Sequence, residues 1–163
     1  MIFLKCNNER RFQMDEITEL NIKNFEKCSN IWNMEKNKEL KDRFYKELLS
    51  KNRVTFVYVK DKEYIAELSI VFNKNDEDYT IPEKRLYISR IIVKKALRGK
   101  GYGKKLMNYA IDYAKKQKYE ELSLGVNLDN YIALKLYVGL GFTKIQYIGE
   151  DSDGKYVKLI KSL

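Results

Sequence analysis

Residues 85–105, RLYISRIIVKKALRGKGYGKK, decide how the chain folds. An apolar run rich in β-branched residues ends at Val93, a basic glycine-rich turn follows, and apolar residues then recur with a helical period. The predicted order is strand, loop, helix. Gly99, Gly101 and Gly103 occupy every second position of the loop, so no Cβ atoms there keep a ligand away from the backbone amides.

This loop is suited to bind an anion, above all a phosphate. The first turn of the following helix supplies unpaired N–H groups and the positive end of the helix dipole. Basic residues surround the glycines with no acidic residue among them: Lys94, Lys95, Arg98, Lys100, Lys104 and Lys105. The alternative is an ordinary tight turn with solvated lysines, because glycine-rich turns also close other strand–helix junctions.

The glycine spacing excludes two familiar phosphate loops. A P-loop requires G-x-x-x-x-G-K-[ST], and a dinucleotide fingerprint requires G-x-G-x-x-G, which no frame starting at Gly99 or Gly101 supplies. The segment Arg98-x-x-Gly101-x-Gly103 resembles instead the R/Q-x-x-G-x-G/A signature of the GCN5-related N-acetyltransferase (GNAT) family. In that family this loop holds the pyrophosphate of acetyl-CoA.

The remaining pattern predicts one domain built on a mixed sheet. We expect helices at residues 25–32, 36–51, 106–118 and 130–140, and strands at residues 16–20, 53–60, 64–72, 85–93, 121–126, 142–148 and 156–160. Three successive strands followed by strand–helix alternation indicate an α/β (α+β) fold with helices on both faces of the sheet. The GNAT fold has this element order, with a mostly antiparallel sheet and splayed central parallel strands. We expect a single N-acetyltransferase domain at residues 16–163 after an N-terminal extension, residues 1–15.

A second motif follows downstream. Residues 130–142, NYIALKLYVGLGF, are similar to the family's N-x-x-A-x-x-x-Y-x-x-x-G-F stretch. By this resemblance Tyr137 is the general acid that protonates the departing coenzyme A thiolate. A phenol with a pKa of about 10 can donate to a thiolate whose thiol has a pKa of about 8.5, if hydrogen-bonding reach allows. The alternative is a core aromatic, because Tyr137 lies on the apolar stripe of its helix.

The resemblance also implies which residues bind acetyl-CoA. The strand ending at Val93 would splay from its parallel neighbour and leave main-chain groups free for the pantetheine amides, while Asn130 would cap its helix and contact the pantetheine arm. The glycine loop would hold the pyrophosphate mainly through backbone N–H groups. The residues assigned in this way are Ile91, Ile92, Val93, Arg98, Gly99, Lys100, Gly101, Tyr102, Gly103, Lys104 and Asn130.

The general base is not identified by any motif. The chain contains no histidine, which excludes His-dependent triads and imidazole ligands, and two cysteines without CxxC spacing do not indicate a metal site. The carboxylate candidates near the predicted splay are Glu67 and Glu121, and Ser89 or Tyr87 could position a water instead. For each of them a structural role is the alternative.

Composition narrows the choice of partners and compartment. The net charge of +9 calls for an anionic partner, and coenzyme A, nucleic acid or an anionic membrane surface would each satisfy it. The chain lacks a nucleic-acid recognition motif, an apolar run long enough to span a membrane and a signal-peptide core, so we expect neither nucleic acid nor membrane as partner. Free thiols at Cys6 and Cys28 fit a cytoplasmic protein.

The predicted function is transfer of an acetyl group from acetyl-CoA to a primary amine by direct attack in a ternary complex, without a metal. The alternative is a non-catalytic acyl-CoA-binding regulatory module on the same fold. Acidic residues at 73–83 and 150–153 favour a small cationic amine or a peptide amine as acceptor, unless they are merely hydrophilic turns. The open edge of the last hairpin makes a homodimer an expectation.

Overall fold

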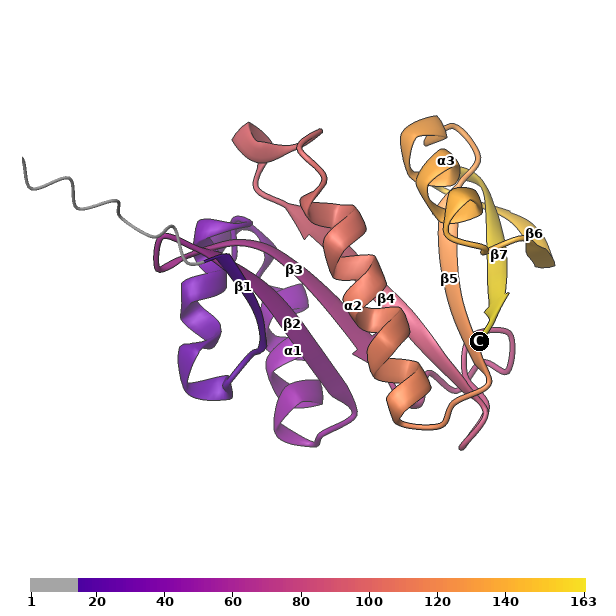
Figure 1. The fold of residues 1–163 in the computed structure, drawn as a ribbon, viewed down its shortest axis with the longest axis horizontal. Coiled ribbons are helices and arrows are strands. Elements are labelled where there is room, and N and C mark those ends of the chain that lie inside the picture. Colours follow the sequence, from indigo (N-terminus) through magenta and orange to yellow (C-terminus); the bar gives the residue numbers. More distant parts are fainter. Residues whose placement is uncertain (1–14) are drawn as a thin grey trace, which may run out of the picture.

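The computed structural model describes residues 15–163, so the predicted extension at residues 1–15 lies almost entirely outside the described residues. One sheet with strand order β1-β2-β3-β4-β5-β7-β6 organises the chain (Figure 1). Its strands are β1 (Asp15–Glu19), β2 (Arg53–Lys60), β3 (Glu63–Val71), β4 (Arg85–Val93), β5 (Glu121–Asn127), β6 (Lys144–Asp151) and β7 (Gly154–Ser162). β6 is an edge strand, as the last hairpin predicts, and the homodimer stays a prediction.

The strand pairing confirms the predicted mixed, mostly antiparallel sheet. Every pair of neighbouring strands is antiparallel except β4 and β5, which run parallel. Parallel neighbours need a crossover connection, and α2 (Tyr102–Lys116) supplies it. The glycine loop therefore lies between the end of β4 and the start of α2, at the opposite end of β4 from its parallel pairing with β5.

Helices cover both faces of the sheet and bury a separate cluster on each (Figure 1). α2 packs Leu106 and Met107 on one face, together with residues of every strand from β2 to β5 and of β7. On the other face, Trp32 and Phe44 pack together with Val57 of β2, and Phe44 belongs to α1 (Lys38–Leu49). No helix within residues 15–163 is long and apolar enough to cross a membrane.

The first two predicted helices differ in detail from those observed. The first is a 3-10 helix, η1 (Ile22–Asn30), because its Asn, Cys and Ser residues are weak α-helix formers, and Asn21 caps it by accepting from the Lys23 amide. The second is split into a short 3-10 turn, η2 (Glu35–Asn37), and α1. α3 (Tyr131–Gly139) and the short η3 (Lys95–Leu97) complete the helices of residues 15–163.

The parallel pair of strands separates soon after it begins. β4 and β5 pair only through Arg85, Leu86 and Tyr87 of β4, opposite residues 121–123. Beyond Tyr87 the facing edge of β4 has no strand beside it, as the predicted splay requires. The closed end is fastened by Arg85, whose Nε donates to the Glu121 carboxylate at 2.7 Å and whose Nη1 donates to the Glu77 carbonyl at 2.7 Å.

We expect Arg85→Ala to lower the free energy of unfolding by about 3 to 5 kcal/mol, because it leaves the Glu121 carboxylate buried without its partner. The Arg85 and Glu121 side chains are only 5% and 14% exposed, so the pair is largely shielded from solvent. Urea denaturation measures the change. The control is Lys41→Ala, which removes an ion pair to the 73% exposed Glu26 and should have a smaller effect. Equal effects of the two substitutions would contradict this role of Arg85.

Candidate active site

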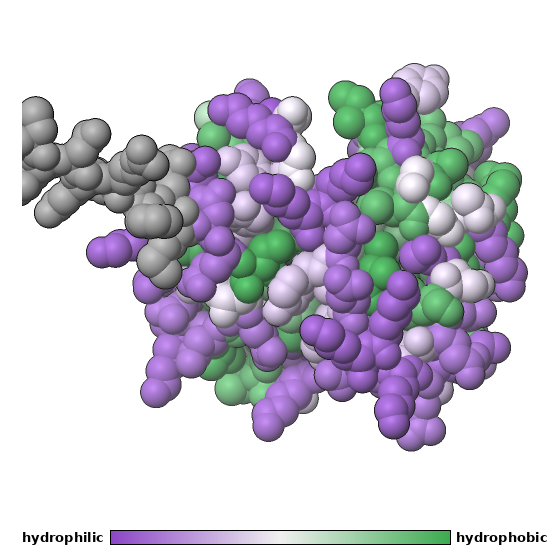
Figure 2. Space-filling model, in the orientation of Figure 1, coloured by the Kyte–Doolittle hydropathy of each residue, from purple (hydrophilic) through white to green (hydrophobic). Residues whose placement is uncertain are grey.

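A cavity of about 470 Å³ opens where β4 separates from β5. Figure 2 shows the cleft from one side, with hydrophilic residues over the glycine loop and hydrophobic residues over α3. Its lining residues come from β4, the glycine loop and α3: Ile91, Ile92, Val93, Leu97, Arg98, Gly99, Gly101, Tyr102, Gly103, Lys104, Asn130, Ile132, Ala133, Leu136 and Tyr137. We call it the donor cavity. It is apolar along its length and basic at one end.

The glycine loop has the backbone shape that its sequence predicts. Gly99 and Gly101 have φ of 77° and 89°, in the left-handed region that glycine adopts without a steric penalty. Gly101 is the N-cap of α2, so the free N–H groups of the first turn of that helix lie at the basic end of the donor cavity. The Arg98 Nε donates to the Val93 carbonyl at 3.1 Å, which holds this side chain against the end of β4.

The structure brings together all but one of the residues assigned to coenzyme binding from sequence. Lys100 is exposed and does not line the donor cavity, because the chain turns outward between the two left-handed glycines. Sequence reasoning missed Leu97, Ile132, Ala133 and Leu136. Ala133 could have been found, since it is a specified position of the second motif, whereas Leu136 and the 88% exposed Ile132 occupy unspecified positions of that motif.

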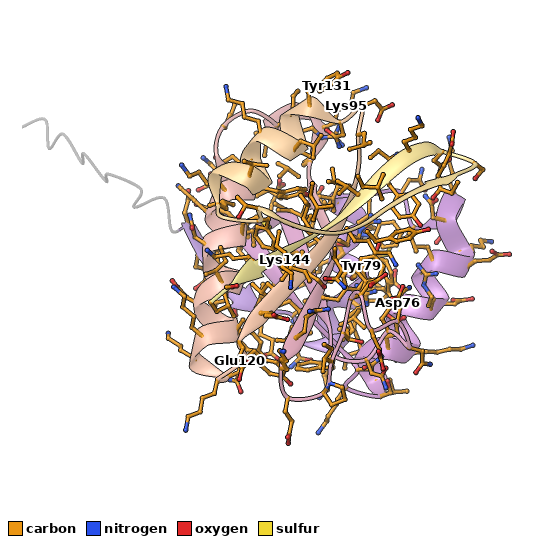
Figure 3. All side chains as sticks on the ribbon, turned by 90° about the vertical axis from the view of Figure 1, so that its right-hand side faces the viewer. Asp76, Tyr79, Lys95, Glu120, Tyr131 and Lys144 are labelled. Atoms are coloured by element: carbon orange, nitrogen blue, oxygen red, sulfur yellow. The ribbon has the colours of Figure 1, made fainter. Side chains whose placement is uncertain are left out.

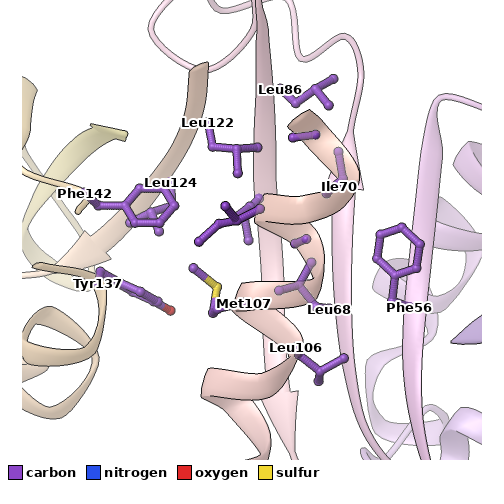
Figure 4. Packing of buried hydrophobic residues seen from close by; sticks show 14 of the residues in the cluster. Phe56, Leu68, Ile70, Leu86, Leu106, Met107, Leu122, Leu124, Tyr137 and Phe142 are labelled. Carbon is purple, nitrogen blue, oxygen red and sulfur yellow. The ribbon is translucent and has the colours of Figure 1, made fainter. Parts of the chain in front are cut away.

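Tyr137 lies at the junction of the donor cavity and a second one. The ring is buried against Phe142 in the α2-side cluster, and its hydroxyl points toward α2 (Figure 4). That hydroxyl makes no hydrogen bond within residues 15–163, although the side chain borders both cavities. Burial raises the pKa of the Tyr137 phenol above its ordinary value. The phenol is therefore protonated at neutral pH and free to donate.

The second cavity, of about 560 Å³, is called the acceptor cavity here. Its wall includes the tilted ring pair of Tyr79 and Tyr87, with ring centroids 4.2 Å apart. Tyr79 lies close against Gly125 of β5, where a Cβ would come within 2.6 Å of the Tyr79 hydroxyl. Figure 3 looks onto this face and shows Tyr79 and Asp76, from the loop before β4, between the β6–β7 hairpin and α1.

Acidic and basic groups meet on the floor of the acceptor cavity. The Lys158 ammonium donates to Asp76 at 2.9 Å and to Asp78 at 3.0 Å. Burial alone would lower the pKa of Lys158, but the hydrogen bonds and charges of the two aspartates outweigh burial and raise it. The single charge of Lys158 thus offsets part of the charge of two carboxylates of the acidic 73–83 loop. Asp129 and Asp151 also line the cavity and make no ion pair within residues 15–163.

Asn130 borders both cavities as well and begins α3. Its Oδ1 accepts from the Ala133 amide at 3.2 Å, the predicted N-cap. The two motifs found in the sequence therefore meet in space: one forms the basic end of the donor cavity, and the other separates that cavity from the acceptor cavity. A model of the Acetyltransferase (GNAT) family matches residues 14–142.

The chain belongs to the GNAT acetyltransferase family. This confirms the family inferred from the two motifs and, with the sheet described above, the predicted fold. It also places the chain in a family of acyltransferase enzymes, as predicted.

The chain is similar in sequence to individual GNAT proteins over less than half of its length, and similar in fold to a solved GNAT structure over most of it. The chain is 37% identical to N-alpha-acetyltransferase 30 of Saccharomyces cerevisiae over 62 residues, or 38% of this chain, and 35% identical to N-acetyltransferase 8B of Homo sapiens over 68 residues, or 42% of it. These matches span only 35% and 30% of the relatives' lengths. The PaiA N-acetyltransferase of Thermoplasma acidophilum, solved with coenzyme A, has a TM-score of 0.65 at 20% identity, covering 92% of this chain and 99% of that one.

The two carboxylate candidates for the general base of this GNAT protein, and the two hydroxyl candidates for positioning a water, occupy different places. Glu121 is paired with Arg85 at the closed end of the splay, four residues before Gly125 and thus about 13 Å along the strand. Glu67 is 3% exposed, is paired with Arg90 at 3.1 Å and lines neither the donor nor the acceptor cavity. Burial raises the pKa of Glu67, and the charge of Arg90 opposes that effect.

The hydroxyl candidates differ from the carboxylates. Ser89 is the bulged residue of β4, and its Oγ accepts from Arg53 at 2.8 Å. Tyr87 lines the acceptor cavity, and of the four candidates it alone does so. Within residues 15–163 no group of three or more metal-ligating side chains is present.

We expect Gly101→Ala to lower the free energy of unfolding by about 1 to 2 kcal/mol, because the new side chain is strained in the left-handed region. A Cβ at Gly101 meets no atom within 4 Å, so the effect is conformational rather than steric. Chemical denaturation measures it. The control is Gly103→Ala, whose Cβ would make ordinary contacts of 3.7 Å to Ile91 and 3.8 Å to Val93. If Gly101→Ala is as stable as the parent protein, the loop does not require glycine there.

Proposed function

We propose that this protein is an acetyl-CoA-dependent N-acetyltransferase that acts on a primary amine by direct attack in a ternary complex. The observation that carries the proposal is the place of Tyr137, which borders both the donor cavity and the acceptor cavity at the splay. Membership in the GNAT family supports acetyl-CoA as the donor. A group that touches both cavities can act on a thioester in one while a nucleophile approaches from the other.

The donor cavity suits the three parts of acetyl-CoA. The pyrophosphate binds the N–H groups at the start of α2, with Arg98 and Lys104 on the cavity wall beside it. The pantetheine arm takes the place of a strand along the open edge of β4, where main-chain groups have no strand partner beyond Tyr87. The apolar residues Ile132 and Leu136 of α3 cover the arm from the opposite wall.

The chemistry follows from what surrounds the thioester. The amine nitrogen attacks the acetyl carbonyl carbon, and backbone N–H groups at the open edge of β4 stabilise the oxyanion. When the carbon–sulfur bond breaks, the Tyr137 hydroxyl donates its proton to the thiolate. The attacking nitrogen, now bonded to the acetyl carbon, releases one N–H proton to water, and a proton from water restores the Tyr137 phenol. The phenol is uncommitted within residues 15–163, so no existing hydrogen bond has to be broken for this step. No protein carboxylate is needed for it.

The acceptor amine must first lose a proton, because an alkylammonium has a pKa of about 10.4. A water held by the Tyr87 hydroxyl in the acceptor cavity is positioned to accept that proton and pass it to solvent. Asp129 and Asp151, which have no ion-pair partner within residues 15–163, attract the cationic form of the amine to the cavity. The acceptor is a small amine or a peptide amine that reaches Tyr137 from this side.

We expect Tyr137→Phe to lower kcat by about 10²- to 10⁴-fold, the usual contribution of a general acid, with an unchanged Kd for acetyl-CoA. Thiol release during steady-state turnover measures kcat, and calorimetric titration measures Kd. Tyr131→Phe, on the same helix but 76% exposed, is the control. An unchanged kcat would remove the acid role. Coenzyme binding by the parent protein without turnover on any amine would instead favour a non-catalytic acyl-CoA-binding module.

Two neighbouring lysines of the glycine loop should differ in their effect on donor binding. Lys104 lines the donor cavity and Lys100 does not, so Lys104→Glu should raise the Kd for acetyl-CoA about tenfold or more, equivalent to about 1.4 kcal/mol. Lys100→Glu makes the same change of charge and should have a clearly smaller effect. Calorimetry at fixed salt gives both values. If the two variants bind acetyl-CoA with the same Kd, the position of Lys104 on the cavity wall does not matter, and the loop acts on the donor only through its net positive charge.

A further inference from the structure

A third cavity, of about 150 Å³, lies between α1 and β4 on the same face of the sheet as the acceptor cavity. Four basic side chains line it, Arg43, Arg53, Lys74 and Arg90, against one carboxylate, Glu47. We call it the basic cavity. A water molecule occupies about 30 Å³ in the liquid, so the cavity holds about five waters or one short side chain with a charged end.

The positive charge of the basic cavity is only partly neutralised. The Arg53 Nε donates to Glu47 at 2.6 Å, and Arg90 is paired with Glu67 at 3.1 Å. Arg43 and Lys74, both exposed at the mouth, have no carboxylate partner within residues 15–163. An anion entering the mouth could therefore pair with Arg43 and Lys74 without displacing a carboxylate of the protein.

The floor of the basic cavity is held in place. The Arg53 guanidinium lies 3.9 Å from the Phe44 ring centroid, and its Nη1 donates to Ser89. Arg90 lies 4.6 Å from the Trp32 ring. Burial lowers the pKa of Arg53; its bond to Glu47 opposes this, and the charge of Arg43 adds to it. The site is preorganised and still short of negative charge.

Tyr87 connects the basic cavity to the acceptor cavity. Its side chain lines both, and the charges that act on its phenol come from both sides, from Arg43 and Arg53 on one and from Lys158 and Asp76 on the other. A molecule with its amine near Tyr137 and its other end past Tyr87 would span the two cavities.

We infer that the acceptor carries a carboxylate near its reactive amine, and that Arg43 and Lys74 bind this carboxylate while the amine lies in the acceptor cavity. The inference rests on the proposed function and narrows its substrate to zwitterionic amines. The carboxylate belongs either to an acidic side chain next to a peptide's amino terminus or to the free carboxyl group of an ω-amino acid, in which several methylene groups separate the two ends. Both present the same group to the basic cavity.

The test compares acceptors that differ only in a carboxylate. One pair is Ser-Glu-Ala-amide and Ser-Gln-Ala-amide, and the other is an ω-amino acid and its amide. We expect at least a tenfold higher kcat/KM for the carboxylate member of one pair, and the pair that shows it identifies the source of the carboxylate. In Arg43→Gln/Lys74→Gln the preference should disappear, with kcat/KM for the neutral member and Kd for acetyl-CoA unchanged.

The control removes the same amount of charge elsewhere. Lys46→Gln/Lys116→Gln changes two exposed lysines that line none of the three cavities and should keep the preference. Equal kcat/KM within both pairs would overturn the inference, as would a preference that survives in Arg43→Gln/Lys74→Gln.

Binding separates this inference from the proposed function. The same peptides and amino acids are titrated calorimetrically into the protein loaded with coenzyme A, where no turnover is needed. A carboxylate preference that is present in binding and lost in Arg43→Gln/Lys74→Gln supports the site even if no amine is acetylated, which would contradict only the proposed catalysis. Turnover on neutral amines without any carboxylate preference in binding or rate would contradict only the site.

Discussion

The early end of the β4–β5 pairing is the constraint on which the cavities depend. Backbone groups of neighbouring strands ordinarily continue to pair, because unpaired buried groups are costly. Here Arg85 and Glu121 fasten the closed end, and pairing stops at Tyr87. Tyr79 occupies the widening gap on one face, and it can do so because Gly125 has no side chain. The separation is therefore built into the packing and does not wait for a ligand.

The two hydrophobic clusters keep the separated strands rigid from opposite sides. α2 packs on β4 and β5 through Leu106 and Met107 and, in the same course, delivers its amino terminus to the open end of the splay. η1 and α1 pack on the other face, where the Phe44 ring contacts the Arg53 guanidinium in the basic cavity. Within residues 15–163, Tyr137 of α3 and its N-cap Asn130 are the residues that border both the donor cavity and the acceptor cavity.

The fold and most of the donor cavity could be predicted because their signals are local. Glycine spacing, helical period and the cap at Asn130 each act within a few residues. The position of Lys100 outside the donor cavity could not be predicted, since it depends on the dihedral angles of Gly99 and Gly101. The ion pairs of Lys158 with the 73–83 loop join residues about eighty positions apart, and no periodic pattern reports them. The basic cavity collects side chains from α1, β2, β4 and a loop for the same reason.

The charge state of Lys158 bears on whether the protein could acetylate its own side chain. Lys158 is a primary amine with a side chain 9% exposed, fixed in the acceptor cavity, where the proposed reaction would activate an acceptor amine. A neutral amine there would compete with the substrate for the acetyl group. Asp76 and Asp78 keep Lys158 charged, and a charged ammonium has no lone pair with which to attack. By pairing with Lys158, Asp76 and Asp78 would thereby protect this side chain from acetylation by the protein itself.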